Sequence, residues 1–199
     1  MGGDSLPFTQ MKRLNFIVIL LLLTQALWGQ ENEQAIRTDV SNYFSLLQEE
    51  KISEALDYVH PDLLAIVGKE MFQQQYNAML NNAEMEVSFG DLVIEKVSEI
   101  YTSSEKGDFA LVDYKFEMDY VINLENEVAR NLMVKSLKAQ FGEDGFTQDG
   151  KNVQVSANRQ MFVNSRTDFE GWRILDYEAG MRIMLVGIIS EEVLKHFGK

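Results

Sequence analysis

The stretch that decides the fold runs from Phe109 to Leu124, FALVDYKFEMDYVINL. Apolar side chains occupy every second position from Ala110 onward. The charged side chains between them are Asp113, Lys115, Glu117 and Asp119. An alternation with a period of two over sixteen residues predicts one long β-strand, buried on one face and solvated on the other.

Other stretches on either side share this extended character. They are Met85–Phe89, which Gly90 ends, Leu92–Tyr101, Asn152–Val163 and Trp172–Tyr177. Turn-forming residues predict turns at Ser103–Asp108 and Arg166–Gly171, and a polar loop at Gly142–Gly150.

Apolar residues at helical spacing precede and interrupt these strands. The predicted helices are Ala35–Gln48, a short piece from Ile52, Gly68–Leu80, Glu125–Phe141 and Val193–Phe197. The residue before a proline is pushed out of the helical region, so His60-Pro61 ends the short piece and His60 is expected at a helix C-terminus. Ser190 has the character of an N-cap residue. The apolar run Met181–Ile189 either packs into the core or forms an exposed patch for dimerisation.

The order of these elements predicts the fold class. Helices come first and long strands follow, which is typical of an α+β fold and not of a parallel sheet with alternating helices. The length of 199 residues suits one domain, which we place at residues 30–199. We expect the first helices to pack against a long curved antiparallel sheet and to leave a cone-shaped cavity. An inserted helix and a short C-terminal helix complete the predicted fold.

The first thirty residues have the pattern of an export signal. Met11-Lys12-Arg13 is a basic start, Phe16–Leu23 is an unbroken apolar run, and Gly29 is a small residue at its exit. This combination predicts a secretory signal peptide at residues 1–29, cleaved after Gly29 or alternatively after Ala26. The apolar stretch is shorter than the roughly 20 residues that span a bilayer, which disfavours the alternative of an uncleaved anchor. Met11 is an alternative start of the chain.

Composition narrows the class of protein further. The 18 basic and 31 acidic residues give a net charge of -13, which disfavours nucleic acid as a partner because phosphate binding needs clustered Lys and Arg. The chain has no cysteine, which excludes disulfides, thiolate zinc sites, thiol catalysis and a lipid-modified N-terminal cysteine. We therefore expect an exported bacterial protein, periplasmic or extracellular, that is not a lipoprotein and has no membrane span once mature.

Part of the chain resembles a known superfamily. Tyr43–Leu47 (YFSLL), Ala55–Asp62 (ALDYVHPD), the helix from Gly68 to Met79 and Gly171–Leu175 (GWRIL) are similar to the NTF2-like superfamily, also called SnoaL-like or ketosteroid-isomerase-like. The resemblance covers roughly residues 31–178 and departs from the common pattern at the inserted helix and after Met181. It implies the cone-shaped fold. The superfamily includes isomerases, cyclases, dehydratases and members without known chemistry, so fold alone does not choose a function.

The candidate catalytic residues are Asp57, Tyr58 and His60. A carboxylate that moves a proton and a phenol that stabilises an oxyanion would suit enolisation, and histidine titrates near neutral pH. The alternatives are a solvated helix face for Asp57 and an ordinary helix-end residue for His60. The only other histidine, His196, is distant in the sequence, and His-Glu-x-x-His is absent, so we expect no metal and no cofactor. The alternating charges from Asp113 to Asp119 fit a solvated sheet face better than a calcium site.

The candidate ligand-binding residues are Tyr43, Tyr76, Tyr114 and Arg159. Arg159 lies in phase with the apolar side chains of its strand, and a guanidinium at such a position needs a carboxylate or an anionic ligand. It would therefore be a counter-ion for an acidic small molecule. The alternatives are a β-bulge, an internal salt bridge or a position past the edge of the core. For the tyrosines, the alternative is a place in the core.

These observations support three hypotheses. The first is an exported NTF2-like module that binds a small molecule or a protein partner without catalysis. The second is an isomerase, cyclase or dehydratase that uses acid and base residues in the cavity, and the third is a purely structural homodimer. The positions of Asp57 and His60 discriminate between the first two, because catalytic side chains must point into one cavity.

Overall fold

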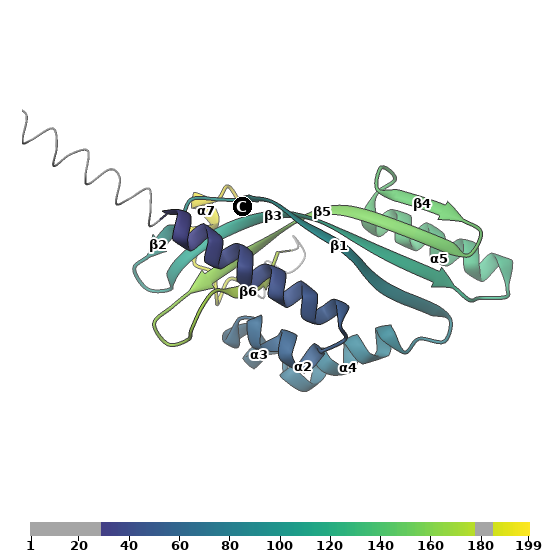
Figure 1. Ribbon diagram of the computed structural model, residues 1–199, viewed down its shortest axis with the longest axis horizontal. Coiled ribbons are helices and arrows are strands. Elements are labelled where there is room, and N and C mark those ends of the chain that lie inside the picture. Colours follow the sequence, from purple (N-terminus) through teal and green to yellow (C-terminus); the bar gives the residue numbers. More distant parts are fainter. Residues whose placement is uncertain (1–28, 178–184) are drawn as a thin grey trace, which may run out of the picture.

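The computed structural model describes residues 29–177 and 185–199 and has an α+β fold, as predicted from the order of elements (Figure 1). A helix over residues 29–48 comes first. The helical elements after it are α2 (Ile52–Ala55), η1 (Leu56–Tyr58), α3 (Pro61–Val67), α4 (Lys69–Leu80), α5 (Glu127–Phe141) and α7 (Glu191–His196). The strands are β1 (Met85–Val97), β2 (Tyr101–Ser103), β3 (Gly107–Ile122), β4 (Phe146–Asp149), β5 (Asn152–Ser165) and β6 (Arg173–Asp176).

The strands form one open antiparallel sheet around β3. The main order is β1-β3-β5-β4, with β2 paired to β3 and β6 paired to β5. The long strand β3 pairs with β5 without interruption from Asp108 opposite Ser165 to Val121 opposite Asn152. In this register Tyr114 lies directly opposite Arg159.

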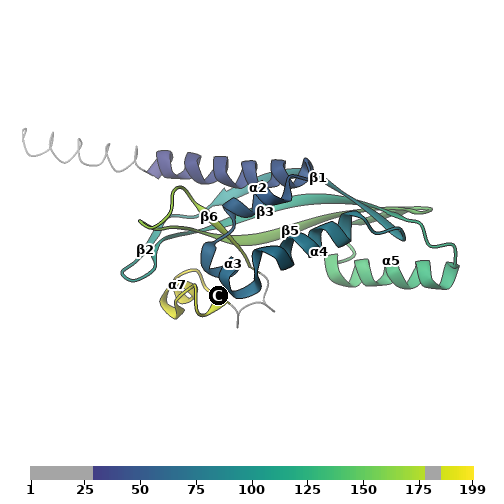
Figure 2. The same ribbon diagram turned by 90° about the horizontal axis from the view of Figure 1, so that it is seen from below.

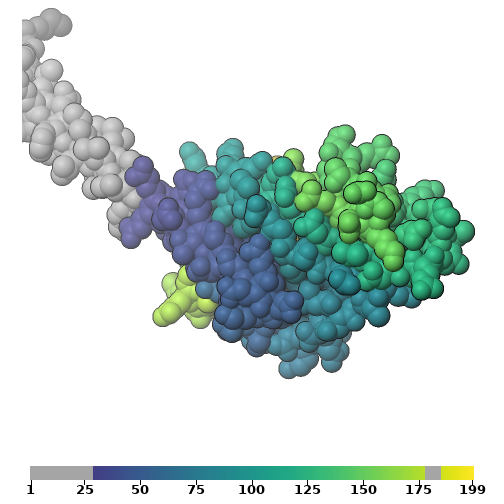
Figure 3. Space-filling view, turned by 45° about the vertical axis from the view of Figure 1, so that its right-hand side comes forward, coloured from purple at the N-terminus to yellow at the C-terminus, as the bar shows by residue number. Residues whose placement is uncertain are grey.

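The predicted alternation of β3 is confirmed, and its buried row serves two cores. Ala110, Val112 and Tyr114 pack with Ile36 and Val40 of helix 29–48. The same row continues at Met118, Tyr120 and Ile122, which pack with Val134 and Leu137 of α5. Helix 29–48 and α5 therefore cover the same face of β3 at opposite ends, and because the sheet twists along its length they appear above and below it in Figure 2. Figure 3 shows the same division, with the purple helix at one end and the green α5 and β4 region at the other.

A third core covers the other face of the sheet near β6. Phe109 and Phe162 point to this face and pack with α7 and with Leu185, Ile188 and Ile189. Leu185, Ile188 and Ile189 belong to the predicted apolar run Met181–Ile189, and the core alternative holds at these three positions, whereas Val186 of the same run is 45% exposed. Residues 181–184 lie outside the described residues.

The structure corrects the expected place of His60. The short helical piece does end before it, because Val59 has extended backbone angles. His60 does not close that helix, however, but is the N-cap of α3, with Pro61 at the first helical position. Proline suits this position because its missing N–H would have no helical partner there. The sequence analysis missed α3 because the proline was interpreted only as a stop.

Two strands also differ from the prediction. Gly90 does not end a strand but sits within β1, at an irregularity in its pairing with β3 between Phe89 and Leu92. A Cβ atom at this position would lie 2.9 Å from the Cβ atom of Glu117, so glycine allows the close approach of the two strands. The polar loop Gly142–Gly150 contains β4, which pairs with β5. Pairing across the sheet, and not local composition, makes this segment extended.

One N-cap is predicted, at Ser190, and the structure shows another that the sequence analysis did not predict, at Asn126. Ser190 is at the N-cap position of α7, but its side chain makes no capping hydrogen bond, and its buried Oγ atom has no hydrogen-bond partner among residues 29–177 and 185–199. Asn126 caps α5, since its Oδ1 atom accepts hydrogen bonds from the backbone N–H groups of Val128 and Ala129 at 2.9 and 3.2 Å. The inserted helix Glu125–Phe141 is confirmed as α5.

Candidate functional site

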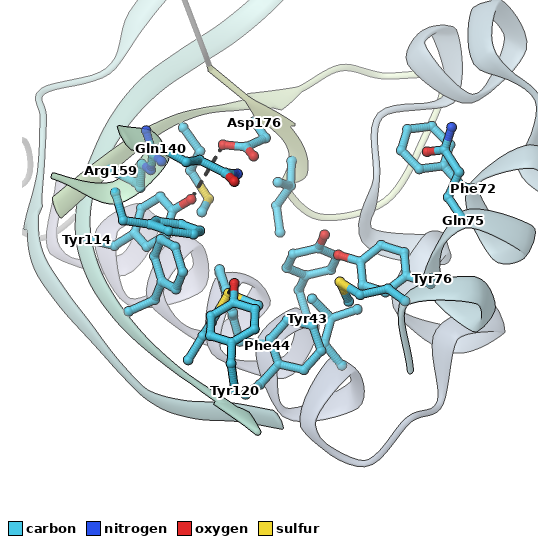
Figure 4. Close-up of a pocket in the computed structure, with 18 residues that line it drawn as sticks. Tyr43, Phe44, Phe72, Gln75, Tyr76, Tyr114, Tyr120, Gln140, Arg159 and Asp176 are labelled. Carbon is cyan, nitrogen blue, oxygen red and sulfur yellow. Dashed lines mark hydrogen bonds between the residues drawn. The ribbon is translucent and has the colours of Figure 1, made fainter. Parts of the chain in front are cut away.

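A cavity of about 380 Å³ lies between helix 29–48, α4, α5 and the face of the sheet that carries Tyr114 (Figure 4). Its wall is mainly aromatic and aliphatic, with a few polar groups. The lining residues are Tyr43, Phe44, Leu47, Phe72, Gln75, Tyr76, Met79, Phe89, Tyr114, Phe116, Met118, Tyr120, Gln140, Phe141, Arg159, Met161, Ile174 and Asp176. An apolar wall with a few polar groups is typical of small-molecule sites.

Aromatic rings in contact form a continuous part of the wall. The ring of Phe44 lies 5.2 Å from that of Tyr43 and 5.5 Å from that of Tyr114. The row continues from Tyr114 to Phe116 and from there to Phe141 of α5, with centroid distances of 6.0 and 6.3 Å. These distances are those of favourable edge and offset contacts, so the rings support one another around the cavity.

The four candidate ligand-binding residues come together here. Tyr43 is on helix 29–48, Tyr76 on α4, Tyr114 on β3 and Arg159 on β5, and all four line the same cavity. Figure 4 shows Tyr43 and Tyr76 beside each other on one side of it, while Tyr114 and Arg159 lie on the opposite side. A site built from four separate elements depends on how the helices pack on the sheet.

Burial makes the tyrosine hydroxyls poor acids. Burial is the main cause that raises the pKa of Tyr43 well above its ordinary value, and the neighbouring Tyr76 hydroxyl adds to it. Burial likewise raises the pKa of Tyr76 and Tyr114, and it raises that of Tyr120 to about 12. All four phenols are therefore neutral at physiological pH and offer O–H groups as donors and acceptors.

Arg159 stands at the polar end of the cavity. Its guanidinium lies 5.7 Å from the centre of the Phe141 ring, a cation–π contact. Within residues 29–177 and 185–199 it has no hydrogen bond and no ion pair. Figure 4 places Gln140 and Asp176 at the same end, and the Tyr114 hydroxyl donates to Asp176 Oδ1 at 3.4 Å.

The sequence analysis missed several polar residues of this wall. Gln140 comes from the C-terminal turn of α5, Gln75 from α4 and Asp176 from the end of β6. Asp176 had a usable signal, because its predicted strand pairs next to that of Arg159, and the structure places it opposite Met161. The two glutamines had none, since polar residues on an amphipathic helix usually face solvent.

Two of the candidate catalytic residues lie in a different place. Asp57 and Tyr58 line a separate, more open hollow together with Asp39, Glu54 and Arg173. The carboxylate of Asp57 is largely exposed and forms an ion pair with Lys69 Nζ at 3.0 Å. Asp57 therefore lies on a solvated helix face, which was the alternative to a catalytic role.

His60 is completely buried, and hydrogen bonds occupy both of its ring nitrogens. Nδ1 accepts from the backbone N–H of Asp62 at 3.1 Å, so the ring proton is on Nε2, which donates to Asn164 Oδ1 at 3.0 Å. Burial is the main cause that lowers the pKa of His60, and the Arg166 charge adds to it, while Asn164, Asp62 and Asp168 oppose the shift. This arrangement makes His60 a neutral structural link between α3 and β5.

No metal site can be assembled from the described part of the chain, where no group of three or more Asp, Glu or His side chains could hold an ion. None of the helices in residues 29–177 and 185–199 is long and apolar enough to cross a membrane. Comparison with family models and with curated proteins gives no match to this chain.

Proposed function

We propose that this protein is an exported NTF2-like module that binds a small molecule in the cavity between its helices and its sheet, without catalysis. The observation that carries the proposal is the cavity of about 380 Å³, lined by contacting aromatic rings and by a few polar groups. Its size falls within the roughly 300–1,000 Å³ of small-molecule pockets. A concave site of this kind suits a small molecule better than a protein surface.

The position of the cavity supports the NTF2-like assignment. In the cone-shaped fold that the sequence resemblance implies, the ligand lies between the first helices and a long curved sheet. The cavity here has walls from helix 29–48 and α4 on one side and from β3 and β5 on the other. The inserted helix α5 adds a wall through Gln140 and Phe141.

The two alternative functions have less support. An enzyme that used Asp57, Tyr58 and His60 would need these side chains in one cavity, whereas Asp57 is exposed and His60 is held in hydrogen bonds elsewhere. A structural homodimer formed through the outer sheet face would need apolar side chains there. Asp113 instead accepts a hydrogen bond from Gln160, and Asp119 accepts one from Gln154.

A neutral fluorescent probe tests the proposal. N-Phenyl-1-naphthylamine is apolar and becomes bright when it leaves water, so we expect it to bind the mature protein with a saturable increase in fluorescence. Met79 lines the cavity from α4, and Met79→Trp should fill part of the space and weaken binding by about tenfold or more, because overpacking excludes the probe. The measurement is a fluorescence titration.

Met71→Trp is the matched control. Met71 lies on the same helix but is 52% exposed and points away from the cavity wall. The control should bind the probe as the unmodified protein does. Absence of saturable binding to the unmodified protein, or an equal loss in both variants, would refute a small-molecule site in this cavity.

A further inference from the structure

We propose that the ligand is an organic acid with a flat apolar body, and that Arg159 binds its anionic group; this inference rests on the proposed function. The reasoning starts from the guanidinium. It carries five N–H donors and a permanent positive charge, and within the described residues no carboxylate pairs with it and no acceptor receives its hydrogen bonds. A half-buried arginine in this state favours an anion that takes two parallel hydrogen bonds.

Charged side chains from several elements lie near Arg159. Asp176 is at the same end of the cavity, but its carboxylate accepts the Tyr114 hydroxyl. Asp113 projects from the opposite face of β3 and accepts the amide of Gln160 at 2.6 Å. Lys115 and Asp144 both border an adjoining shallow hollow that Arg159 also lines, and Glu95 and Lys96 border another. Each hollow therefore carries charges of both signs. Within the described residues none of these carboxylates forms an ion pair with Arg159, so its N–H donors are available to a ligand.

The rest of the cavity selects the body of the ligand. The rings of Phe44, Tyr114 and Phe116 line one wall, and Phe141 is both part of this wall and the ring beneath the Arg159 guanidinium. Aromatic walls favour flat apolar groups, which they bury against ring faces. The hydroxyls of Tyr43 and Tyr76 are on the far side, where they could bind a second polar group of the ligand.

A pair of matched probes separates this inference from the proposed function. 8-Anilino-1-naphthalenesulfonate has the skeleton of N-phenyl-1-naphthylamine with one added sulfonate. We expect the unmodified protein to bind the sulfonate more tightly than the neutral probe. Arg159→Gln should weaken sulfonate binding by about 10- to 100-fold, the range for losing a hydrogen bond to a charged group, while binding of the neutral probe changes little.

Two further variants define what Arg159 contributes. Arg159→Lys keeps the charge but loses the planar fork, so its affinity for the sulfonate should fall between those of the unmodified protein and Arg159→Gln. Lys115→Gln removes the same charge from β3, where Lys115 lies opposite Asn158, the neighbour of Arg159. This control should change sulfonate affinity by less than about threefold at physiological salt, because a screened charge without contact has a small effect.

The outcomes of these titrations distinguish failure of the acid proposal from failure of the small-molecule site. If the neutral probe binds and Arg159→Gln leaves the ratio of sulfonate to neutral affinity unchanged, the acid proposal is wrong and the small-molecule site stands. An equal loss of both probes in Arg159→Gln also overturns it, because Arg159 would then only maintain the cavity. If neither probe binds the unmodified protein, the proposed function fails and this inference fails with it.

Discussion

At the residue scale, His60 shows how one buried polar side chain links distant segments. Its Nε2 proton goes to Asn164, whose amide in turn donates to the backbone oxygens of Lys106 and Asp108, each at 3.0 Å. The ring also lies edge-on to Phe169, with centroids 5.5 Å apart. A hydrogen-bond network in which every polar group has a partner stabilises a fold. A proton added to Nδ1 of His60 would point at the Asp62 N–H and would remove the hydrogen bond between them.

Stability should therefore depend on pH through His60. Its pKa is lowered in the folded state, so the unfolded chain binds the proton more readily and stability falls as the pH drops through the unfolded value of about 6.5. One such group contributes a slope of at most about 1.4 kcal/mol per pH unit. Urea unfolding at a series of pH values from 8 to 5 should show this loss of stability, because this range spans the histidine pKa of the unfolded chain, about 6.5.

The variant His60→Gln should flatten that slope, because glutamine does not titrate. His196→Gln is the matched control, since His196 is exposed near the C-terminus and its replacement leaves His60 in place. The control should keep the slope of the unmodified protein. If the slope persists in His60→Gln and disappears in His196→Gln, the pH dependence of stability comes from His196, and the prediction for His60 is wrong.

At the element scale, α5 has two roles. Its inner side packs Val134 and Leu137 against the sheet, and its last turn brings Gln140 and Phe141 to the cavity. Its outer side exposes Val128 and Leu132, which are 78% and 68% accessible. Since the helix buries only one face, its N-cap contributes a meaningful part of its local stability.

We expect Asn126→Ala to lower the free energy of unfolding by about 1 kcal/mol, the usual effect of losing an N-cap side chain. Asn131→Ala is the matched control within the same helix, at an exposed position where alanine is the better helix former, so it should be neutral or slightly stabilising. Urea unfolding of both variants measures the difference. Equal stability of the two variants would show that the cap does not limit α5.

At the scale of the whole molecule, the proposed export would leave a mature chain that is slightly more acidic than the full sequence. Removing residues 1–29 takes away Asp4, Lys12 and Arg13 and leaves 16 basic and 30 acidic residues, a net charge of -14. A strongly acidic surface keeps a protein soluble and repels anionic membranes and nucleic acids. It also makes a cationic side chain inside the cavity more important for attracting an acidic ligand.

The export proposal predicts a defined mature chain. Expressed in a Gram-negative bacterium, the protein should be recovered from the periplasm with an intact mass that begins at Gln30 or, with the alternative cleavage, at Leu27. Leu21→Arg together with Leu22→Arg should block processing, because charges disrupt the apolar run that the export machinery needs. Leu6→Arg lies outside that run and should be processed normally. Full-length protein in the cytoplasm would contradict the proposal.

Local periodicity explains why much of the fold could be predicted. The alternation along β3 and the helical spacing in α4 and α5 are properties of consecutive residues, and the structure confirms them. The α3 helix and the β4 strand were missed for different reasons. The signals of α3 are local, a proline at the first helical position and a His60 ring that accepts from the Asp62 N–H, but the proline also fits a helix stop. The β4 strand depends on pairing with β5, which local sequence does not report.

The sequence by itself determined the α+β class, the long central strand and the position of Arg159 on an apolar row. Only the tertiary structure decided that Arg159 shares a cavity with Tyr43 and Tyr76 while His60 is held elsewhere. The physical reason is that periodicity is a local property of consecutive residues, whereas a site is formed by residues far apart in the sequence. Periodicity reports which face of an element is buried, whereas a site depends on which faces meet. That is set by the strand register, the sheet twist and the helix packing, which bring Tyr43 to the same cavity as Arg159, more than a hundred positions away.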